Sequence, residues 1–482
     1  MKSLSEKTVS GIIWTVGQQF GVQLINFAVQ ILLARLLLPA EFGLIAMLTV
    51  FISVGNALVD SGLTSSLIRT HEADETDYTT VFFINLISSI VIYAVIFVSA
   101  PGIASFYEQP ELTAVIRVYT ITFILQALMA VQATRLTKEM NFKAQMLMQL
   151  PAVMVGGIVG VTLAYLQSGV WSLVSFYLSQ TFILVCLYWL RSKWRPKFII
   201  DTRKLKHHFR FGYKLTLAAI LNAVFTNIYN LVIGKYFSAT QLGYYNRADT
   251  LQLFPVQNIS TALNKVTYPM FATIQNDLSK LKNAYKKIMQ QVVFWLTPLM
   301  IFLAIIAEPL FRIVLTEKWI PAVPYFRILC AVGILYPLQL YNLNILNVLG
   351  RSDLFLKLEV IKKIIIGIGV ALSIRYGIYG LLYFQVFFSI LAFFINSFFS
   401  GRLISYPVME QLRDILPLYG MAFLSGLCIW RLDVFLIDYY TGIHDVTRII
   451  INSAAFAIFY LSVSFLLRVP ALNDFRQLIL KR

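Results

Sequence analysis

Side chains able to bind a polar ligand occur inside stretches that are otherwise apolar. Within residues 11–37, four amides recur at i, i+4, i+7 and i+11: Gln19, Gln23, Asn26 and Gln30. This spacing places them on one face of a helix. Two further polar sets are Asn222, Thr226 and Asn230, and Gln339, Asn342, Asn344 and Asn347. Such faces either join helices through hydrogen bonds, at about 0.6 kcal/mol each, or line a water-filled cavity. The stripe at 19–30, repeated at 222–230, favours the cavity.

Charged side chains in the same stretches are rarer. Arg247 and Asp249 lie about one to two helical turns inside residues 242–266 at 1.5 Å per residue, and Asp60 lies near the end of residues 42–67. Asp60 and Asp249 are candidates for coupling to an ion. Arg35 and Lys235 stand at the ends of apolar stretches, where snorkelling to the membrane surface is an equal alternative to ligand binding.

The composition places these side chains in a membrane protein. Of 482 residues, 58% are hydrophobic and 13% are charged, and the mean hydropathy is +0.73, whereas a soluble domain carries about 25% charged residues. A span needs about 20 mostly apolar residues, and the chain offers about fourteen such stretches. They lie near 11–37, 42–67, 79–100, 112–134, 145–167, 170–190, 211–234, 242–266, 286–307, 323–349, 354–374, 377–400, 413–436 and 448–468. We therefore predict an all-α polytopic fold. In the stretch 413–436, Arg431 and Asp433 interrupt the apolar run.

The positions of lysine and arginine predict the orientation. With an even number of spans, both termini lie on one side, and that side receives most of the basic residues, including the cluster from Arg191 to Lys214. The positive-inside rule then places both termini in the cytoplasm. The net charge of +17 is read as a topology signal that also attracts anionic lipid headgroups. Because the charge is dispersed among short loops, nucleic acid is not expected as a partner.

Sequence signals for catalysis or metal binding are missing. Cys186, Cys330 and Cys428 lie in separate apolar runs and read as core residues rather than as disulfides or ligands. His207 and His208 are adjacent and so would not share a helical face. No phosphate-binding loop or nucleophile elbow occurs. The sequence therefore predicts no metal, no cofactor and no enzymatic activity.

The chain resembles itself at an offset of 200 residues. Arg35 corresponds to Lys235, Gly43 to Gly243 and Leu63 to Leu263. Further on, the sequence GVWSL from 169 resembles GIYGL from 377 at an offset of 208, and Arg117 and Arg327 lie at the starts of the fourth and tenth predicted spans. A repeat of six spans is even, so both copies face the same way and enclose a central cavity. We predict a six-helix lobe at 1–200, a second at 201–405, and two additional helices at 406–482.

Short motifs in a constant order resemble a known family. They are SEKTVSG at 5–11, RLLLPAEFG at 35–43, DSGL at 60–63, MNFK at 140–143, RFG at 210–212, GYYNRA at 243–248 and TEKW at 316–319. The chain is similar to Wzx-type polysaccharide flippases of the colanic and teichuronic acid exporter branch. These belong to the multidrug/oligosaccharidyl-lipid/polysaccharide exporter superfamily.

The resemblance implies a protein of the bacterial inner membrane. It implies alternating-access transport of undecaprenyl-diphosphate-linked oligosaccharides for surface polysaccharide biosynthesis, and it leaves open partnership with a polysaccharide polymerase and glycosyltransferases. Arg35, Lys235 and Arg247 would then suit the diphosphate, which needs charge-assisted donors. The polar stripes, including Asn230, would suit sugar hydroxyls.

Two other classes compete with this interpretation. A drug/cation antiporter of the same superfamily would be expected to have twelve spans and an acidic cavity, whereas the charges inside the spans here are biased towards basic residues. A membrane glycosyltransferase or polymerase would be expected to carry catalytic residues in a long outer loop. The predicted outer loops are short.

Overall fold

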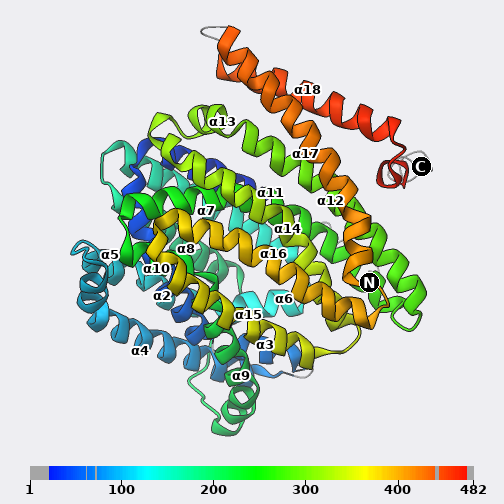
Figure 1. The fold of residues 1–482 in the computed structure, drawn as a ribbon. Coiled ribbons are helices and arrows are strands. Elements are labelled where there is room, and N and C mark those ends of the chain that lie inside the picture. Colours follow the sequence, from blue (N-terminus) through cyan, green and yellow to red (C-terminus); the bar gives the residue numbers. More distant parts are fainter. Residues whose placement is uncertain (1–20, 61, 71–72, 440–443, 475–482) are drawn as a thin grey trace. The chain divides into compact units, whose positions relative to one another are not determined.

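The computed structural model describes residues 21–474 except 61, 71–72 and 440–443. Within these residues every regular element is a helix (Figure 1). The chain divides into two compact units, Met1–Gly243 and Tyr244–Arg482. The polar residue Gln19 lies outside the described residues.

The first unit contains ten helical segments among its described residues. They are Gly21–Leu36, α2 (Pro39–Asp60), α3 (Leu63–Arg69), α4 (Glu75–Tyr107), α5 (Leu112–Tyr119), α6 (Ile121–Lys138), α7 (Phe142–Tyr165), α8 (Val170–Arg191), α9 (Thr202–Thr226) and α10 (Ile228–Tyr236). In the second unit and across its boundary follow α11 (Ala239–Thr273), α12 (Leu278–Ile305), α13 (Ala307–Val314), η1 (Glu317–Ala322), α14 (Val323–Val348), α15 (Ser352–Ser373), η2 (Ile374–Tyr376), α16 (Gly377–Leu403), α17 (Val408–Tyr439) and α18 (Asp445–Leu466).

Polar residues at the helix ends explain where several helices start. Asp74 caps α4 by accepting hydrogen bonds from the backbone N–H of Thr76 and Asp77, and the Asp77 side chain closes a capping box. Asn141, Asp201 and Asp277 cap α7, α9 and α12 in the same way. Short side chains that accept backbone N–H bonds satisfy the free donors of the first helical turn.

The membrane-spanning character of the fold is confirmed, whereas the number of spans stays a prediction. Each of the fourteen predicted stretches overlaps a described helix. Ten helical segments among the described residues are long and apolar enough to cross a membrane, or eleven if the bent pair α9 and α10 is one span. The segment Ser352–Leu403 counts once but holds two predicted spans. Gly21–Leu36 is a shorter apolar helix, and the first ten residues of its predicted span, 11–20, lie outside the described residues.

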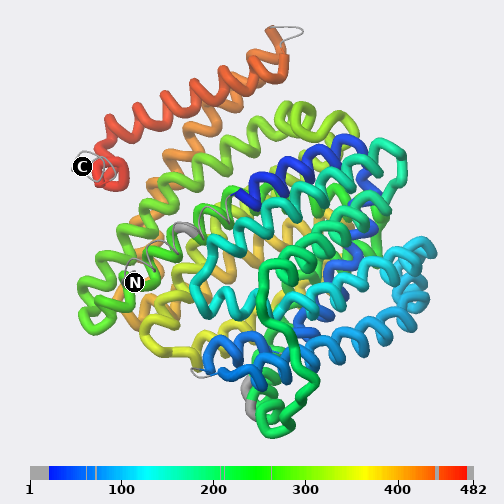
Figure 2. The backbone as a smooth tube through the Cα atoms, turned by 180° about the vertical axis from the view of Figure 1, so that it is seen from behind, coloured from blue at the N-terminus to red at the C-terminus, as the bar shows by residue number. Residues whose placement is uncertain are grey.

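In the first unit, α7 and α8 form the most extensively paired helices, and they follow each other along the tube in Figure 2. Helices α9 and α10 pack on α2, and α9 also contacts α3 and α4. Residues 202–236, which the internal repeat assigns to the second lobe, therefore share a compact unit with residues of the first. The two units are defined by contacts between residues, whereas the two lobes are defined by the sequence repeat. The lobe boundaries therefore remain a prediction.

In the second unit, α14 pairs with α16 and α12 with α17, while α18 packs on α17 (Figure 1). Arg448 of α18 donates two hydrogen bonds of 2.6 Å to the carboxylate of Asp433, and the Asn452 amide donates a third. Both charged side chains are buried. The charge that interrupts the predicted thirteenth span is thus compensated from the next helix.

Two segments related by the 200-residue offset touch each other reciprocally. A Cβ atom on Gly43 would lie 1.8 Å from the carbonyl oxygen of Ala239, and one on Gly243 would lie 1.9 Å from that of Pro39. The two contacts are reciprocal, because Gly43 meets Ala239 as Gly243 meets Pro39. Neither position has room for a side chain.

Arg117 and Arg327, near the starts of the predicted fourth and tenth spans, make similar contacts, one in each unit. Arg117 donates from Nε to the carbonyl of Phe97 at 3.3 Å, and Arg327 donates from Nε to the carbonyl of Ala304 at 3.1 Å. Gly169 and Gly377, at the start of the two similar motifs, both have positive φ angles of 57° and 72°. The internal repeat itself stays a prediction.

The glycine contact predicts a steric response to a single methyl group. Gly43→Ala should destabilise the protein by about 1–3 kcal/mol, because overpacking against a backbone oxygen forces the helices apart. Gly102→Ala in α4 is the control, since nothing lies within 4 Å of its added Cβ, and it should be neutral or stabilising by about 0.5–1 kcal/mol. Thermal unfolding in detergent measures both, and equal melting temperatures would contradict the contact.

The buried ion pair makes a second prediction about stability. Arg448→Ala should cost about 3–5 kcal/mol, because it leaves the Asp433 carboxylate buried and uncompensated. Replacing both partners, Asp433→Leu with Arg448→Met, should recover much of the loss. Arg431→Ala, at an exposed position of the same helix pair, is the control and should change unfolding little. If Arg448→Ala and the double variant have the same free energy of unfolding, the uncompensated Asp433 carboxylate is not the cause of the loss.

Candidate functional site

A polar stripe runs along α2 on the side where α9 and α10 pack. Thr49, Ser53, Asn56 and Asp60 follow one another at i, i+4, i+7 and i+11, and all four are half-buried. The spacing is the one noted at 19–30, and it places the four on one helical face. Sequence reasoning identified only Asp60 here. The same periodicity search, extended to hydroxyl side chains, would have found the other three.

Amides from the facing helices meet this stripe. Asn230 of α10 donates from Nδ2 to Thr49 Oγ1 at 3.2 Å, and Asn227 donates to Ser53 Oγ at 3.4 Å. The Oδ1 atom of Asn56 is buried and has no hydrogen-bond partner among the described residues. Weak, long hydrogen bonds and an unsatisfied acceptor leave hydrogen-bonding capacity for another polar molecule. We call the α2 stripe with Asn227 and Asn230 the polar seam.

One end of the polar seam is closed by tight backbone packing and an ion pair. The reciprocal contact of Gly43 and Gly243 lies at this end, where α2 begins. Lys235 Nζ lies 3.0 Å from Glu108 Oε1 and 5.2 Å from the centre of the Phe106 ring. The predicted ligand Lys235 therefore has an acidic partner within the protein, and an anionic ligand would compete with Glu108 for it.

The other end of the polar seam is closed by a buried histidine and a shared carboxylate. His208 of α9 is fully buried, with Nδ1 2.8 Å from Ser66 Oγ and Nε2 3.2 Å from Asp77 Oδ1. Lys204 lies 3.0 Å from the same carboxylate group. A Cβ on Gly62 would come within 2.8 Å of the Gly212 backbone. Asp60 lies near this end and accepts a 2.5 Å hydrogen bond from Thr64.

Lys204 also forms an ion pair with Asp74, whose carboxylate lies 2.5 Å away, and acid would weaken this pair. The hydrogen bond from Lys204 is the largest of the effects that lower the pKa of Asp74 to about 2. A carboxylate whose pKa is depressed on folding contributes stability above its ordinary pKa, near 3.9, and loses it as the pH falls towards the folded value. The carboxylate contact to Lys204 is therefore intact at neutral pH.

The amides of the first described helix turn towards protein. Gln23, Asn26 and Gln30 are half-buried, whereas Leu24 and Leu32 are 59% and 49% exposed. Gln30 Nε2 donates to Tyr177 Oη of α8 at 3.3 Å. Arg35, beyond these amides, is exposed. Leu24 and Leu32 therefore lie on the more exposed side of this helix, whereas the apolar residues Val29, Leu33 and Ala34 are buried.

Arg247 and Asp249 belong to the second unit, on α11. The Arg247 side chain is 5% exposed, and its guanidinium carbon lies 5.9 Å from the centre of the Trp319 ring. Trp319, in η1, is fully buried and also contacts Tyr244 edge-on. A cation over an indole face is stabilised by about 0.5–2 kcal/mol. The motifs GYYNRA and TEKW are thus joined in space, while Asp249 is half-buried nearby in the same helix.

The amides of α14 act between helices. Gln339 donates to Ser389 Oγ at 2.7 Å, and Asn342, fully buried, donates to Ser397 Oγ at 3.1 Å. Asn344 donates to Asn264 Oδ1 at 2.6 Å. These three amides serve as interhelical hydrogen bonds, the alternative considered for every polar set. Asn347 is exposed.

An apolar groove of about 860 Å³ runs between α11, α12 and α18 in the second unit. Its walls include Leu263, Trp295, Phe302, Phe456 and Leu461. The volume is that of a site for a sizeable ligand. Among the described residues, no cluster of three or more His, Cys, Asp or Glu could hold a metal ion.

The many membrane-length helices define a multi-pass membrane protein, and the fold is that of transporters. Over 95% of the chain it matches the solved lipid II flippase MurJ in its inward closed conformation, at 13% identity with a TM-score of 0.74 over 99% of that chain. It also matches an inward-facing multidrug resistance MATE family transporter of the MOP superfamily over 80% of this chain and 94% of that one, at 20% identity with a TM-score of 0.62.

The chain belongs to the polysaccharide biosynthesis protein family, whose model matches residues 32–324. It is 26% identical to the teichuronic acid biosynthesis protein TuaB of Bacillus subtilis, over 73% of this chain and 74% of that one. It is 26% identical to the lipopolysaccharide biosynthesis protein WzxC of Escherichia coli, over 82% and 81%. The succinoglycan biosynthesis transport protein ExoT of Rhizobium meliloti is 27% identical over 70% and 68%. The expected family resemblance is confirmed.

The polar seam predicts which positions water reaches. In a background without Cys186, Cys330 and Cys428, Asn56→Cys and Gln23→Cys should react with hydrophilic maleimides at least about tenfold faster than Leu24→Cys. Contacts at helix ends open on microsecond to second timescales, so minutes of labelling sample the open states. Lipophilic maleimide should label all three and so serves as the control. If Asn56→Cys and Gln23→Cys do not react while Leu24→Cys does, the hydrated face is the one that carries Leu24.

Proposed function

We propose that the protein is a flippase that moves lipid-linked oligosaccharide repeat units across the bacterial inner membrane during surface polysaccharide biosynthesis. Its relatives carry the names of teichuronic acid, lipopolysaccharide and succinoglycan biosynthesis proteins, and one of them is named a transport protein. The single observation that carries the proposal is a polar seam within a membrane-spanning unit, closed by contacts at both ends.

The two ends of the polar seam suit alternating access. A substrate can enter from one side only if one set of contacts opens while the other holds. The end near Gly43 is held by packing and by the Lys235–Glu108 pair, and the end near His208 by buried hydrogen bonds and Lys204. Hydroxyls of a sugar would bond to the amides and hydroxyls between them, which already make only long hydrogen bonds to one another.

The apolar groove of the second unit, taken by itself, has the chemistry that a polyprenyl chain requires. A polyprenyl chain needs a long apolar surface and no hydrogen bonds, and the groove walls are mostly aliphatic and aromatic. The diphosphate needs a cation, for which Arg35, Lys235 and Arg247 remain the proposed ligands. Asp60 and Asp249 remain proposed sites of ion coupling.

Translocation alone, without catalysis, is the proposed activity, and both termini are proposed to lie in the cytoplasm. The lipid-linked oligosaccharide comes from glycosyltransferases and passes to a polymerase, so these enzymes are the proposed functional partners. The MATE structural match is evidence of fold alone. The basic bias of the charges inside the spans favours the anionic substrate over a drug cation.

Substitution of Arg247 tests the anionic part of the substrate. In a host that lacks its own flippase for the same glycan, Arg247→Ala should reduce surface polysaccharide at least about tenfold, and Arg247→Lys should also reduce it, because lysine offers only a point charge to a diphosphate. Protein abundance is checked by blot and folding by gel filtration. Arg375→Ala, at an exposed position in η2, is the control and should export normally.

Full export by a normally abundant Arg247→Ala protein would refute the substrate role and leave Arg247 as a structural partner of Trp319. Absence of export by the unaltered chain, in hosts carrying the cognate glycan, would instead refute the flippase function.

A further inference from the structure

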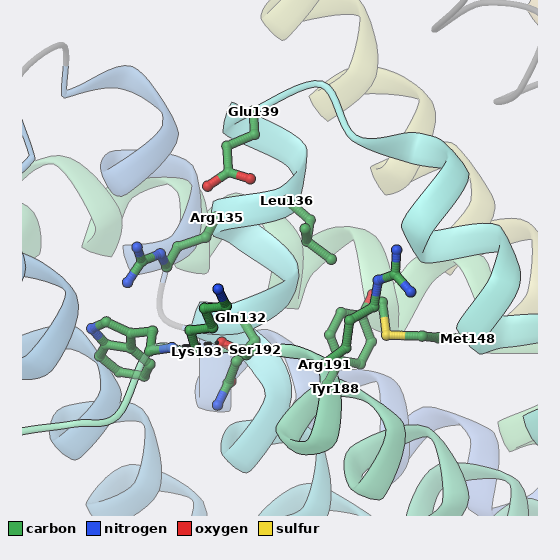
Figure 3. A pocket seen from close by; sticks show the side chains of 10 residues that line it. Gln132, Arg135, Leu136, Glu139, Met148, Tyr188, Arg191, Ser192 and Lys193 are labelled. Atoms are coloured by element: carbon green, nitrogen blue, oxygen red, sulfur yellow. Dashed lines mark hydrogen bonds between the residues drawn. The ribbon is translucent and has the colours of Figure 1, made fainter.

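A basic cavity of about 270 Å³ lies in the first unit, outside the polar seam. It is formed by the last turn of α6, the first half of α7, the end of α8 and the segment that follows α8. Figure 3 shows Arg135 and Glu139 on one side of it and Arg191 on the other, beside Met148. Lys193 lines it between them.

Three cations and one acid line the cavity. Arg135 is held in place by Glu75, whose carboxylate lies 3.4 Å away, and by the Tyr78 ring 5.0 Å away. Arg191 and Lys193 are exposed. Neither forms an ion pair or a side-chain hydrogen bond with the residues that the structure describes. The cavity therefore presents two uncommitted positive charges beside a third that is fixed.

Interaction with the end of α8 does not account for both of the uncommitted charges. Arg191 lies in the last turn of α8, where the helix dipole favours a cation. Lys193 lies beyond that helix, after Ser192 has turned the backbone to an extended conformation, so no helix terminus accounts for its place on the cavity wall. Guanidinium and ammonium groups converging on one cavity are the donors that a phosphate group recruits.

The apolar part of the cavity wall, and the position of the cavity along the helices, indicate which kind of molecule carries the phosphate. Leu136 and Met148 line the cavity beside the cations. Helices α6, α7 and α8 are each part of an apolar segment long enough to span a membrane, so a cavity at their ends lies at the level of lipid headgroups. Its volume is below the range of about 300–1,000 Å³ that suits drug-sized ligands. A headgroup entering from the bilayer matches both the size and the mixed polarity.

We propose that this cavity binds the phosphate group of an anionic phospholipid from the leaflet at this end of the spans. The phosphate is bonded by Arg191 and Lys193 and approached by Arg135, and the glycerol and acyl region leaves past Leu136 and Met148. The proposal does not depend on the flippase function, since a resident lipid and a transported one would bind at different places.

Native mass spectrometry of the purified full-length protein tests the proposal. Phosphatidylglycerol should be retained at least about tenfold more strongly than phosphatidylcholine, and Arg191→Ala with Lys193→Ala should abolish that preference. Lys197→Ala with Arg203→Ala removes the same charge from exposed positions outside the cavity, and it should change the preference less than about twofold. Gel filtration checks that both double variants fold.

Equal losses in the two double variants would overturn the site, since the preference would then reflect overall charge. Inorganic phosphate at millimolar concentration distinguishes the source of the ligand. If phosphate displaces phosphatidylglycerol and raises the melting temperature of the wild type, but not that of the Arg191→Ala and Lys193→Ala double variant, the cavity is a site for free phosphate. The lipid assignment then fails. Little displacement by phosphate supports the lipid.

Discussion

Every polar side chain that enters the apolar spans of this protein must find a partner in protein or water, because hydrocarbon offers none. The structure meets this demand in different ways. Asn342 and Gln339 bind serines of a neighbouring helix, Asp433 is neutralised by Arg448, and Arg247 rests on the face of Trp319. The hydrogen bonds of Asn342, Gln339 and Asp433 join neighbouring helices, and the Trp319 ring stabilises the Arg247 cation.

The polar seam is one of the places where hydrogen bonding within the protein is incomplete. Its hydrogen bonds between Asn230 and Thr49 and between Asn227 and Ser53 are long, and the Asn56 oxygen is buried without a partner in the described residues. Such a surface costs stability in the empty protein and gains hydrogen bonds when a sugar arrives. A transporter needs this balance, because polar groups that are fully hydrogen-bonded within the protein gain no free energy by bonding to a substrate instead.

The contacts at the two ends of the polar seam differ in physical kind. Near Gly43 the helices meet backbone to backbone, and any side chain would separate them. Near His208 the contact is made of hydrogen bonds and charge, with Asp77 shared by Lys204 and His208. Packing contacts of the first kind form or break as a whole, whereas the second kind is weakened by anions that compete for Lys204.

The sequence by itself determined the membrane class, the all-helical fold, the approximate places of the spans and the family, because apolar length, helical periodicity and ordered motifs are local properties. It also located Asn230, Lys235 and Arg247 as polar or charged groups within or at the ends of spans. Only the tertiary structure decided their neighbours: Thr49 for Asn230, Glu108 for Lys235 and Trp319 for Arg247. Likewise, the amides of α14 and those of the polar seam have similar sequence patterns, yet one set joins helices tightly and the other is only loosely bonded. The partner of a polar group comes from a helix distant in the chain, and periodicity gives the face of a helix but not what that face meets.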